Sequence, residues 1–75
     1  MDEKLYQIAA EALNISVDQA AEHSRTLGEY GAIYAWNPAR GGLAVIVAND
    51  GSKLVAGSAV NFDDHLKTFI DGRRN

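Results

Sequence analysis

Midway along the chain, two apolar and β-branched runs flank an Asp50-Gly51 pair. An Asp-Gly pair between two such runs is a strong signal for a β-hairpin, because hairpin turns need residues that tolerate positive φ. We therefore predict strands over 43–48 and 53–60, with Gly57 marking a bulge or a close backbone approach. The first run is apolar at every position, which is typical of a strand covered on both faces, or on one face with small residues outside.

The segments around this hairpin predict helices and one further strand. Apolar residues at i, i+3, i+4, i+7 and i+8 predict an amphipathic helix over 3–13, which Asp2 can cap. A capping-box spelling at Ser16 begins a second, weaker helix over 17–27, parts of which are also compatible with a strand. Residues 32–36 are aromatic and β-branched and predict a strand. Asn61 can cap the last helix, because its side chain can accept a backbone hydrogen bond at the helix start.

Together these elements predict a single α+β domain over residues 1–75. Its order is an N-terminal helix with a second one after it, a three-stranded antiparallel meander, and a C-terminal helix, with the helices packed on one sheet face. The two edges of such a sheet can pair with a partner strand, so a homodimer through a sheet edge is one possibility. We expect the last helix to bury four apolar side chains: Phe62, Leu66, Phe69 and Ile70.

Charge is distributed unevenly along the chain. Residues 1–30 carry six acids and two bases, a net of −4, whereas residues 31–75 carry four acids and five bases, a net of +1; together they give −3. Phosphate binding needs clustered Lys and Arg, so we expect no direct binding of nucleic acid. An acidic surface suits a basic or nucleic-acid-binding protein partner, because opposite charges raise the association rate. Ordinary solubility explains the same acids equally well.

Membrane, disulfide and metal chemistry find little support in the residues. The chain has no cysteine, no long apolar run and no basic-then-apolar leader, which favours a cytoplasmic protein. Successive helical residues point about 100° apart and cannot converge on one atom. We therefore expect no enzyme, no cofactor and no metal site, and we expect a surface position for His65. This reasoning covers two runs of such residue types, Glu22-His23-Ser24 and Asp63-Asp64-His65, and we expect the first of them to form an exposed helix surface.

Candidate protein contacts fall into two groups. Tyr, Trp and Arg are enriched at binding hot spots, since they combine a large buried area with a polar group. The strand over 32–36 and the loop after it contain this mixture: Tyr34, Trp36, Asn37 and Arg40. Core packing beneath a helix accounts equally well for Trp36. The second group is the acids of the first thirty residues: Glu11, Asp18, Glu22 and Glu29.

A wider pattern covers residues 34–74. It comprises Trp36, Gly41-Gly42, the apolar run 43–47, the Asp-Gly turn and, further on, Ser58, His65-Leu66, Phe69 and Gly72-Arg73. This pattern resembles the bacterial immunity-protein family built on the YrhB domain. The resemblance implies an N-terminal helix, a sheet of a few strands and a closing helix, and a role in neutralising a cognate toxin without catalysis.

The first functional hypothesis is therefore a non-enzymatic inhibitor that occludes a protein partner, such as a toxin. The second hypothesis is a phage-encoded inhibitor of a bacterial defence complex (anti-CRISPR-like). Its acidic surface would compete with nucleic acid for a binding groove of that complex. A third, of a different class, is a structural or chaperone-like module that dimerises through a sheet edge. A toxin gene or phage genes beside the coding sequence would separate the first two hypotheses.

Overall fold

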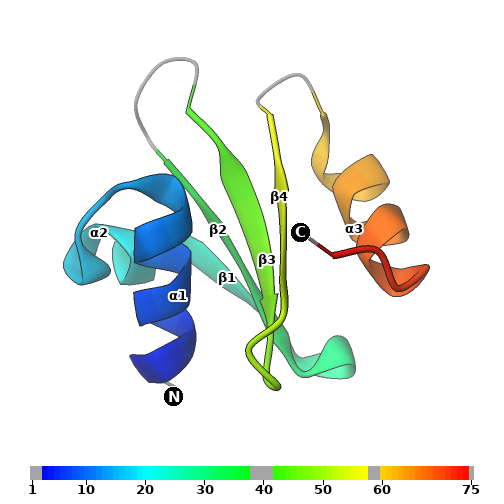
Figure 1. The fold of residues 1–75 in the computed structure, drawn as a ribbon, viewed down its shortest axis with the longest axis horizontal. Coiled ribbons are helices and arrows are strands. Elements are labelled where there is room, and N and C mark those ends of the chain that lie inside the picture. Colours follow the sequence, from blue (N-terminus) through cyan, green and yellow to red (C-terminus); the bar gives the residue numbers. More distant parts are fainter. Residues whose placement is uncertain (1–2, 38–41, 58–59, 75) are drawn as a thin grey trace.

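The computed structural model describes residues 3–37, 42–57 and 60–74 and has an α+β fold. Two helices cover one face of a sheet and a third helix covers the other face, so the molecule has three layers (Figure 1). The predicted α+β class with a helix at each end is confirmed, but the expectation that all helices share one face is wrong. The elements are α1 (Glu3–Leu13), α2 (Val17–Glu22), β1 (Ser24–Leu27), the 3-10 helix η1 (Gly28–Tyr30), β2 (Ala32–Trp36), β3 (Ala44–Ala48), β4 (Lys53–Ala56) and α3 (Phe62–Ile70).

Helix α1 occupies the residues that the apolar spacing predicts. Asn14 follows it with φ 58°, in the left-handed region that Asn tolerates and that commonly ends a helix. The cap expected at Asp2 lies outside the described residues. The buried side chains of α1 form one stripe against the sheet: Leu5, Tyr6, Ala9, Ala10 and Leu13.

The stretch after α1 contains the helix expected over 17–27 only as far as Glu22, and the strand left open for part of this range is found over Ser24–Leu27. Helix α2 begins with the predicted capping box: the Gln19 N–H donates to Ser16 Oγ at 3.1 Å, and the Ser16 N–H donates to Gln19 Oε1 at 3.3 Å. It ends at Glu22, and the chain then forms β1. Ala20 is the buried residue of α2, so little apolar area holds this helix. Pairing with β2 instead satisfies the backbone groups of alternate residues in this strand, those of Arg25 and Leu27.

Over the described residues, the sheet has four antiparallel strands in the order β1-β2-β3-β4, one more than expected. Strand β3 is buried at every position, as predicted for a strand covered on both faces. The Ala48 N–H donates to the Ser52 carbonyl at 2.8 Å and closes the predicted hairpin, with Gly51 at φ 94°. Strand β4 ends at Ala56, earlier than expected. Residues 58 and 59 of the expected strand lie outside the described residues. A Cβ added at Gly57 would meet no described atom within 4 Å, so neither the bulge nor the close approach expected at this glycine is found in the described part of the chain.

Helix α3 begins as predicted, since Asn61 Oδ1 accepts the Asp64 N–H at 2.8 Å. Phe69 is buried, and Phe62 and Leu66 are half-buried in the same cluster. Ile70 is 52% exposed, so its expected burial is wrong, and His65 at 1% exposure takes the inward position instead. Residues four apart lie on the same side of a helix, which places His65 beside Phe69 against the sheet.

The C-terminal segment fastens α3 to the hairpin turn. Arg74 Nε donates to Ser52 Oγ at 2.9 Å, and Arg74 Nη1 donates to the Phe69 carbonyl at 2.9 Å. Its guanidinium carbon also lies 3.9 Å from the centroid of the Phe69 ring. One side chain therefore satisfies a carbonyl at the end of α3, covers a core aromatic ring and reaches the turn between β3 and β4.

Candidate protein-binding surface

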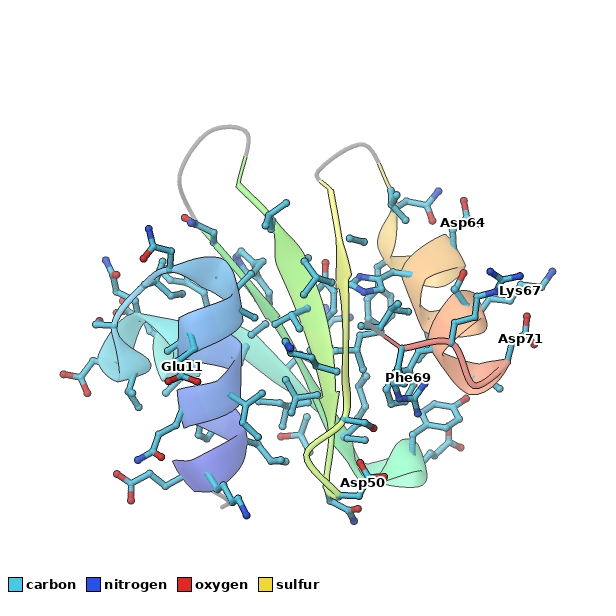
Figure 2. The ribbon with its side chains drawn as sticks, in the orientation of Figure 1. Glu11, Asp50, Asp64, Lys67, Phe69 and Asp71 are labelled. Atoms are coloured by element: carbon cyan, nitrogen blue, oxygen red, sulfur yellow. The ribbon has the colours of Figure 1, made fainter. Side chains whose placement is uncertain are left out.

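Three of the four predicted acidic contacts lie on the layer formed by α1 and α2. Glu11, Asp18 and Glu22 are all exposed there. Residues 3–22 carry four acids and a single base, a net of −3, so this layer is acidic as a whole. Figure 2 shows Glu11 on the opposite side of the sheet from Asp64 and the other labelled charges of the α3 region. The structure thus places this net negative charge on one outer face of the molecule.

The fourth predicted acid, Glu29, is not part of this layer. It is exposed in η1, where it lines a hollow of about 310 Å³ between β1 and α3. The turn at η1 ends with Gly31 at φ 60°, where an added Cβ would lie 2.8 Å from Asn49 Nδ2. Glycine is therefore favoured at the point where the chain turns from η1 into β2. The four predicted acids consequently form two separate groups.

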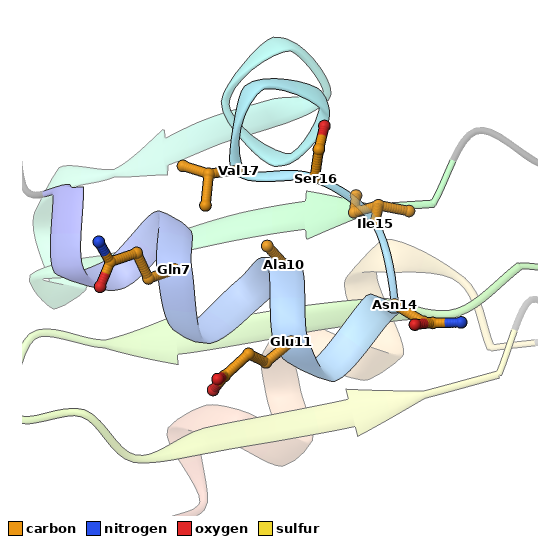
Figure 3. A pocket seen from close by; sticks show the side chains of 7 residues that line it. All are labelled: Gln7, Ala10, Glu11, Asn14, Ile15, Ser16 and Val17. Carbon is orange, nitrogen blue, oxygen red and sulfur yellow. The ribbon is translucent and has the colours of Figure 1, made fainter.

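A hollow of about 500 Å³ lies along the seam between α1 and α2. Figure 3 shows that Glu11, at the border of this hollow, points away from α2. Val17, the first residue of α2, lines the other side of the hollow. The seam combines an acid with amide, hydroxyl and aliphatic groups, which is a composition suited to a mixed polar and apolar contact. Its lining residues are Gln7, Ala10, Glu11, Asn14, Ile15, Ser16 and Val17.

The aromatic residues of β2 lie on the opposite face of the sheet. Tyr34 is half-buried, with its ring centroid 4.7 Å from that of Phe62 in an edge-to-face arrangement and 5.8 Å from that of His65. Trp36 is also half-buried and extends this row, 5.7 Å from Tyr34 and 6.0 Å from His23. Packing against α3 therefore accounts for Tyr34. Trp36 retains some exposed surface at the end of the row.

Asn37 and Arg40 are predicted as contacts together with these aromatic residues, and only Asn37 is among the described residues. Asn37 Nδ2 donates to the Leu13 carbonyl at 3.0 Å, so this amide satisfies the end of α1 rather than a partner. Arg40 lies outside the described residues. The aromatic strand and the acidic helices are thus on different faces, and the structure does not bring the two predicted groups into one site.

The residues of the run Glu22-His23-Ser24, which are of types found in catalytic sites, lie in different elements. Glu22 ends α2, His23 is its C-cap, and Ser24 opens β1 with its hydroxyl donating to the Ala21 carbonyl at 2.8 Å. The expected exposed helix surface is therefore wrong for this run, because the helix stops there and His23 is half-buried. Within the described part of the chain, no three His, Cys, Asp or Glu side chains converge in a group that could hold a metal ion.

His65 is a buried polar residue that the sequence reasoning placed at the surface. Its Nε2 lies 2.7 Å from the Leu54 carbonyl. Since a carbonyl can only accept, Nε2 carries a proton, and Nδ1 is buried without a hydrogen-bond partner among the described residues. The apolar stripe of α3 is short of one inward residue between Phe62 and Phe69, and that gap is the signal that could have located His65 in the core.

None of the helices in the described ranges is long and apolar enough to cross a membrane. Comparison of the chain with protein-family models, with curated proteins and with solved structures gave no match. Any function must therefore be inferred from the residues themselves.

Proposed function

We propose that this chain is a non-enzymatic inhibitor that binds a basic protein through the outer surface of α1 and α2. The observation that carries the proposal is the exposure of Glu11, Asp18 and Glu22 on one helical layer of net charge −3. The hollow between α1 and α2 adds a recess in which a partner side chain can be buried. The acids would steer the encounter, and the recess would supply a desolvated contact.

The resemblance to immunity proteins suggests a cognate toxin as the partner, neutralised by occlusion of its working surface. Many proteins that bind or cut nucleic acid present basic surfaces, so an acidic layer can compete for such a surface. The inhibitor needs no catalytic group of its own. A specific complex requires roughly 800 Å² buried on each partner, which a domain of this size can supply from one helical layer.

A capture experiment with two matched charge variants tests this proposal. The first variant, Glu11→Gln with Asp18→Asn and Glu22→Gln, removes three acids from the α1 and α2 layer. The control variant, Asp63→Asn with Asp64→Asn and Asp71→Asn, removes three exposed acids at α3 and just after it, so both variants change the net charge equally. Thermal unfolding of both variants checks that each remains folded.

The immobilised wild-type chain and both variants are incubated with extract of the source organism, and the retained proteins are identified by mass spectrometry. We expect a basic protein to be retained by the wild type and by the α3 control, and to be lost from the α1 and α2 variant. The purified partner should form a stoichiometric complex, lose its activity and associate more slowly as salt is raised. Equal retention by both variants, or association independent of salt, would contradict the proposal.

A further inference from the structure

Strand β1 lies at one edge of the sheet, and some of its backbone N–H and C=O groups point outward from that edge. β1 is the first strand in the order β1-β2-β3-β4. The Trp36 N–H donates to the His23 carbonyl at 3.0 Å, which fixes the hydrogen-bonding phase of the β1–β2 pair. Backbone groups alternate between the two sides of an antiparallel strand. The N–H and C=O groups of Ser24 and Thr26 therefore point outward, away from β2.

Hollows flank this edge on both faces of the sheet, and Thr26 and Gly28 line both of them. The hollow on the α1 side measures about 210 Å³, and its other walls include apolar side chains of α1 and β2: Leu5, Tyr6, Ala32 and Ile33. The hollow on the α3 side measures about 310 Å³. A strand added beside β1 would direct alternate side chains into these two hollows, which is how peptide-binding sheets combine affinity with selectivity.

Opposite charges line the hollow on the α3 side. Arg25 and Glu29 are both exposed at its wall, and the Arg25 guanidinium lies 5.4 Å from the centroid of the Phe62 ring. A strand running antiparallel to β1 passes Leu27 first, then Thr26, then Arg25. Charge complementarity therefore favours a basic residue opposite Leu27, within reach of Glu29, and an acidic residue opposite Arg25. The residue between them faces the apolar hollow on the α1 side.

We propose that the β1 edge binds an extended segment of a partner protein, antiparallel to β1, with the residue order basic, apolar, acidic. The segment would exchange two backbone hydrogen bonds with Thr26, place its apolar residue in the hollow beside Leu5 and Ile33, and pair its charges with Glu29 and Arg25. This inference goes beyond the inhibitor function, with which it shares only the need for a protein partner.

The probe is the synthetic peptide acetyl-Thr-Lys-Val-Glu-Val-Thr-amide, titrated into the wild-type chain and followed by NMR. We expect chemical-shift changes at Thr26, Gly28 and Ile33 and slower hydrogen exchange of the Thr26 amide. The matched control exchanges the Lys and Glu of the peptide, which keeps its composition and reverses both charge contacts. We expect it to bind about three- to tenfold more weakly, since exposed charge pairs are individually weak. Equal affinity of the two peptides would overturn the proposal.

Methylated peptides separate strand addition from charge attraction. The amide of the first Val faces Thr26, so its N-methylation should weaken binding by about tenfold, the loss expected for removed backbone hydrogen bonds. The amide of the Glu faces away from β1, so its N-methylation should change the affinity by no more than about twofold. Equal losses from both methylations would contradict an added strand.

Two proline variants test, on the protein itself, whether binding needs the outward backbone N–H of β1. Thr26→Pro removes the outward donor of β1, whereas Lys53→Pro makes the same change on β4, whose residue 53 also points away from its neighbouring strand. We expect Thr26→Pro alone to abolish peptide binding. Glu11→Gln with Asp18→Asn and Glu22→Gln should leave it unchanged, so failure of the peptide and failure of the inhibitor function remain distinguishable. If Thr26→Pro does not fold, the methylated peptides decide.

Sedimentation of the wild-type chain tests the rival occupant. We expect a monomer at concentrations where the peptide binds. A concentration-dependent dimer that Thr26→Pro disrupts and Lys53→Pro does not would assign the β1 edge to a second copy of the chain and overturn the proposal.

Discussion

The face of the sheet under α1 and α2 and the face under α3 bury side chains of different kinds. Under α1 and α2 the core is aliphatic apart from Tyr6, with several alanines from α1, α2 and β2 around Val45 and Val47. Under α3 the aliphatic core residues are joined by the buried Phe69 ring, by the half-buried rings of Tyr34 and Phe62, and by the buried side chain of His65. The first core is built from contacts that only require close packing. The second depends on directed contacts, namely the His65 hydrogen bond, the Tyr34 ring pairs and the Arg74 tether.

This difference has a consequence for how each helix tolerates change. In a packed aliphatic layer, the free energy of unfolding falls with the side-chain volume that a substitution removes. Removing a hydrogen-bond donor outside that layer should have little effect on its packing. A layer that also relies on directed contacts loses about 1–3 kcal/mol when one buried donor is removed, even if most of the apolar packing is kept. The two faces should therefore respond to different substitutions.

Removal of volume should have the largest effect on the α1 and α2 face. Leu13 is 3% exposed in that core. We expect Leu13→Ala to lower the free energy of unfolding by about 2–5 kcal/mol, the range for a buried leucine. Ile70→Ala serves as the control, because Ile70 is 52% exposed and its truncation should cost about 0.5 kcal/mol or less. Chemical denaturation measures both; a loss below about 1 kcal/mol for Leu13→Ala would show that this face is loosely packed.

Removal of a hydrogen-bond donor, with an aromatic ring kept in its place, should act on the α3 face. His65→Phe keeps a ring beside Tyr34 but takes away the donor to the Leu54 carbonyl. We expect a loss of about 1–3 kcal/mol in the free energy of unfolding, the cost of a missing partner for a buried polar group. The control is His23→Phe, since His23 is half-buried and makes a ring contact with Trp36. Equal small losses from both changes would show that the His65 hydrogen bond does not hold α3.

The elements that the sequence predicts well are those decided by local patterns. Helix α1 and strand β2 match their expected bounds, and the capping box at Ser16 and the hairpin turn are found where their residues indicate. The stretch after α2 follows from tertiary structure instead. Its four residues carry no clear strand pattern, and they become β1 because β2 offers a backbone edge to pair with.

The predicted binding residues were only partly separable from core residues. Exposed acids such as Glu11 are found at the surface, because a helical stripe defines which positions face outward. The type of an aromatic residue does not indicate whether it faces the core or the surface. Tyr34, predicted as a contact residue, is half-buried against α3. The hollows beside β1 arise between segments distant in sequence, so no local pattern could have indicated them.

The Arg74 tether allows a smaller test of the directed contacts. Arg74→Ala removes the donors to Ser52 and to the Phe69 carbonyl together with the contact over the Phe69 ring. We expect a loss of about 1–2 kcal/mol, allowing for exposure of the guanidinium to solvent. Arg73→Ala is the matched control, because Arg73 is equally close to the C-terminal end and should change stability by about 0.5 kcal/mol or less. If the two variants unfold at the same denaturant concentration, the tether does not stabilise α3.

The smallest expected effect concerns Asp50, at the turn to which this tether attaches. The Ser52 backbone N–H, donating at 2.8 Å, and the Ser52 hydroxyl, donating at 2.7 Å, hold the pKa of Asp50 below its ordinary value, and the Arg74 charge adds to this. The folded state therefore binds fewer protons than the unfolded state, so the contribution of Asp50 to stability is present above about pH 4 and is lost as the pH falls through the lowered pKa. Ser52→Ala removes the hydroxyl donor but keeps the N–H, so the pKa of Asp50 should rise part of the way, and Arg74→Ala should raise it less. NMR titration of the carboxyl group measures both shifts. A larger rise in Arg74→Ala than in Ser52→Ala would show that charge across the tether, and not the turn itself, controls this carboxylate.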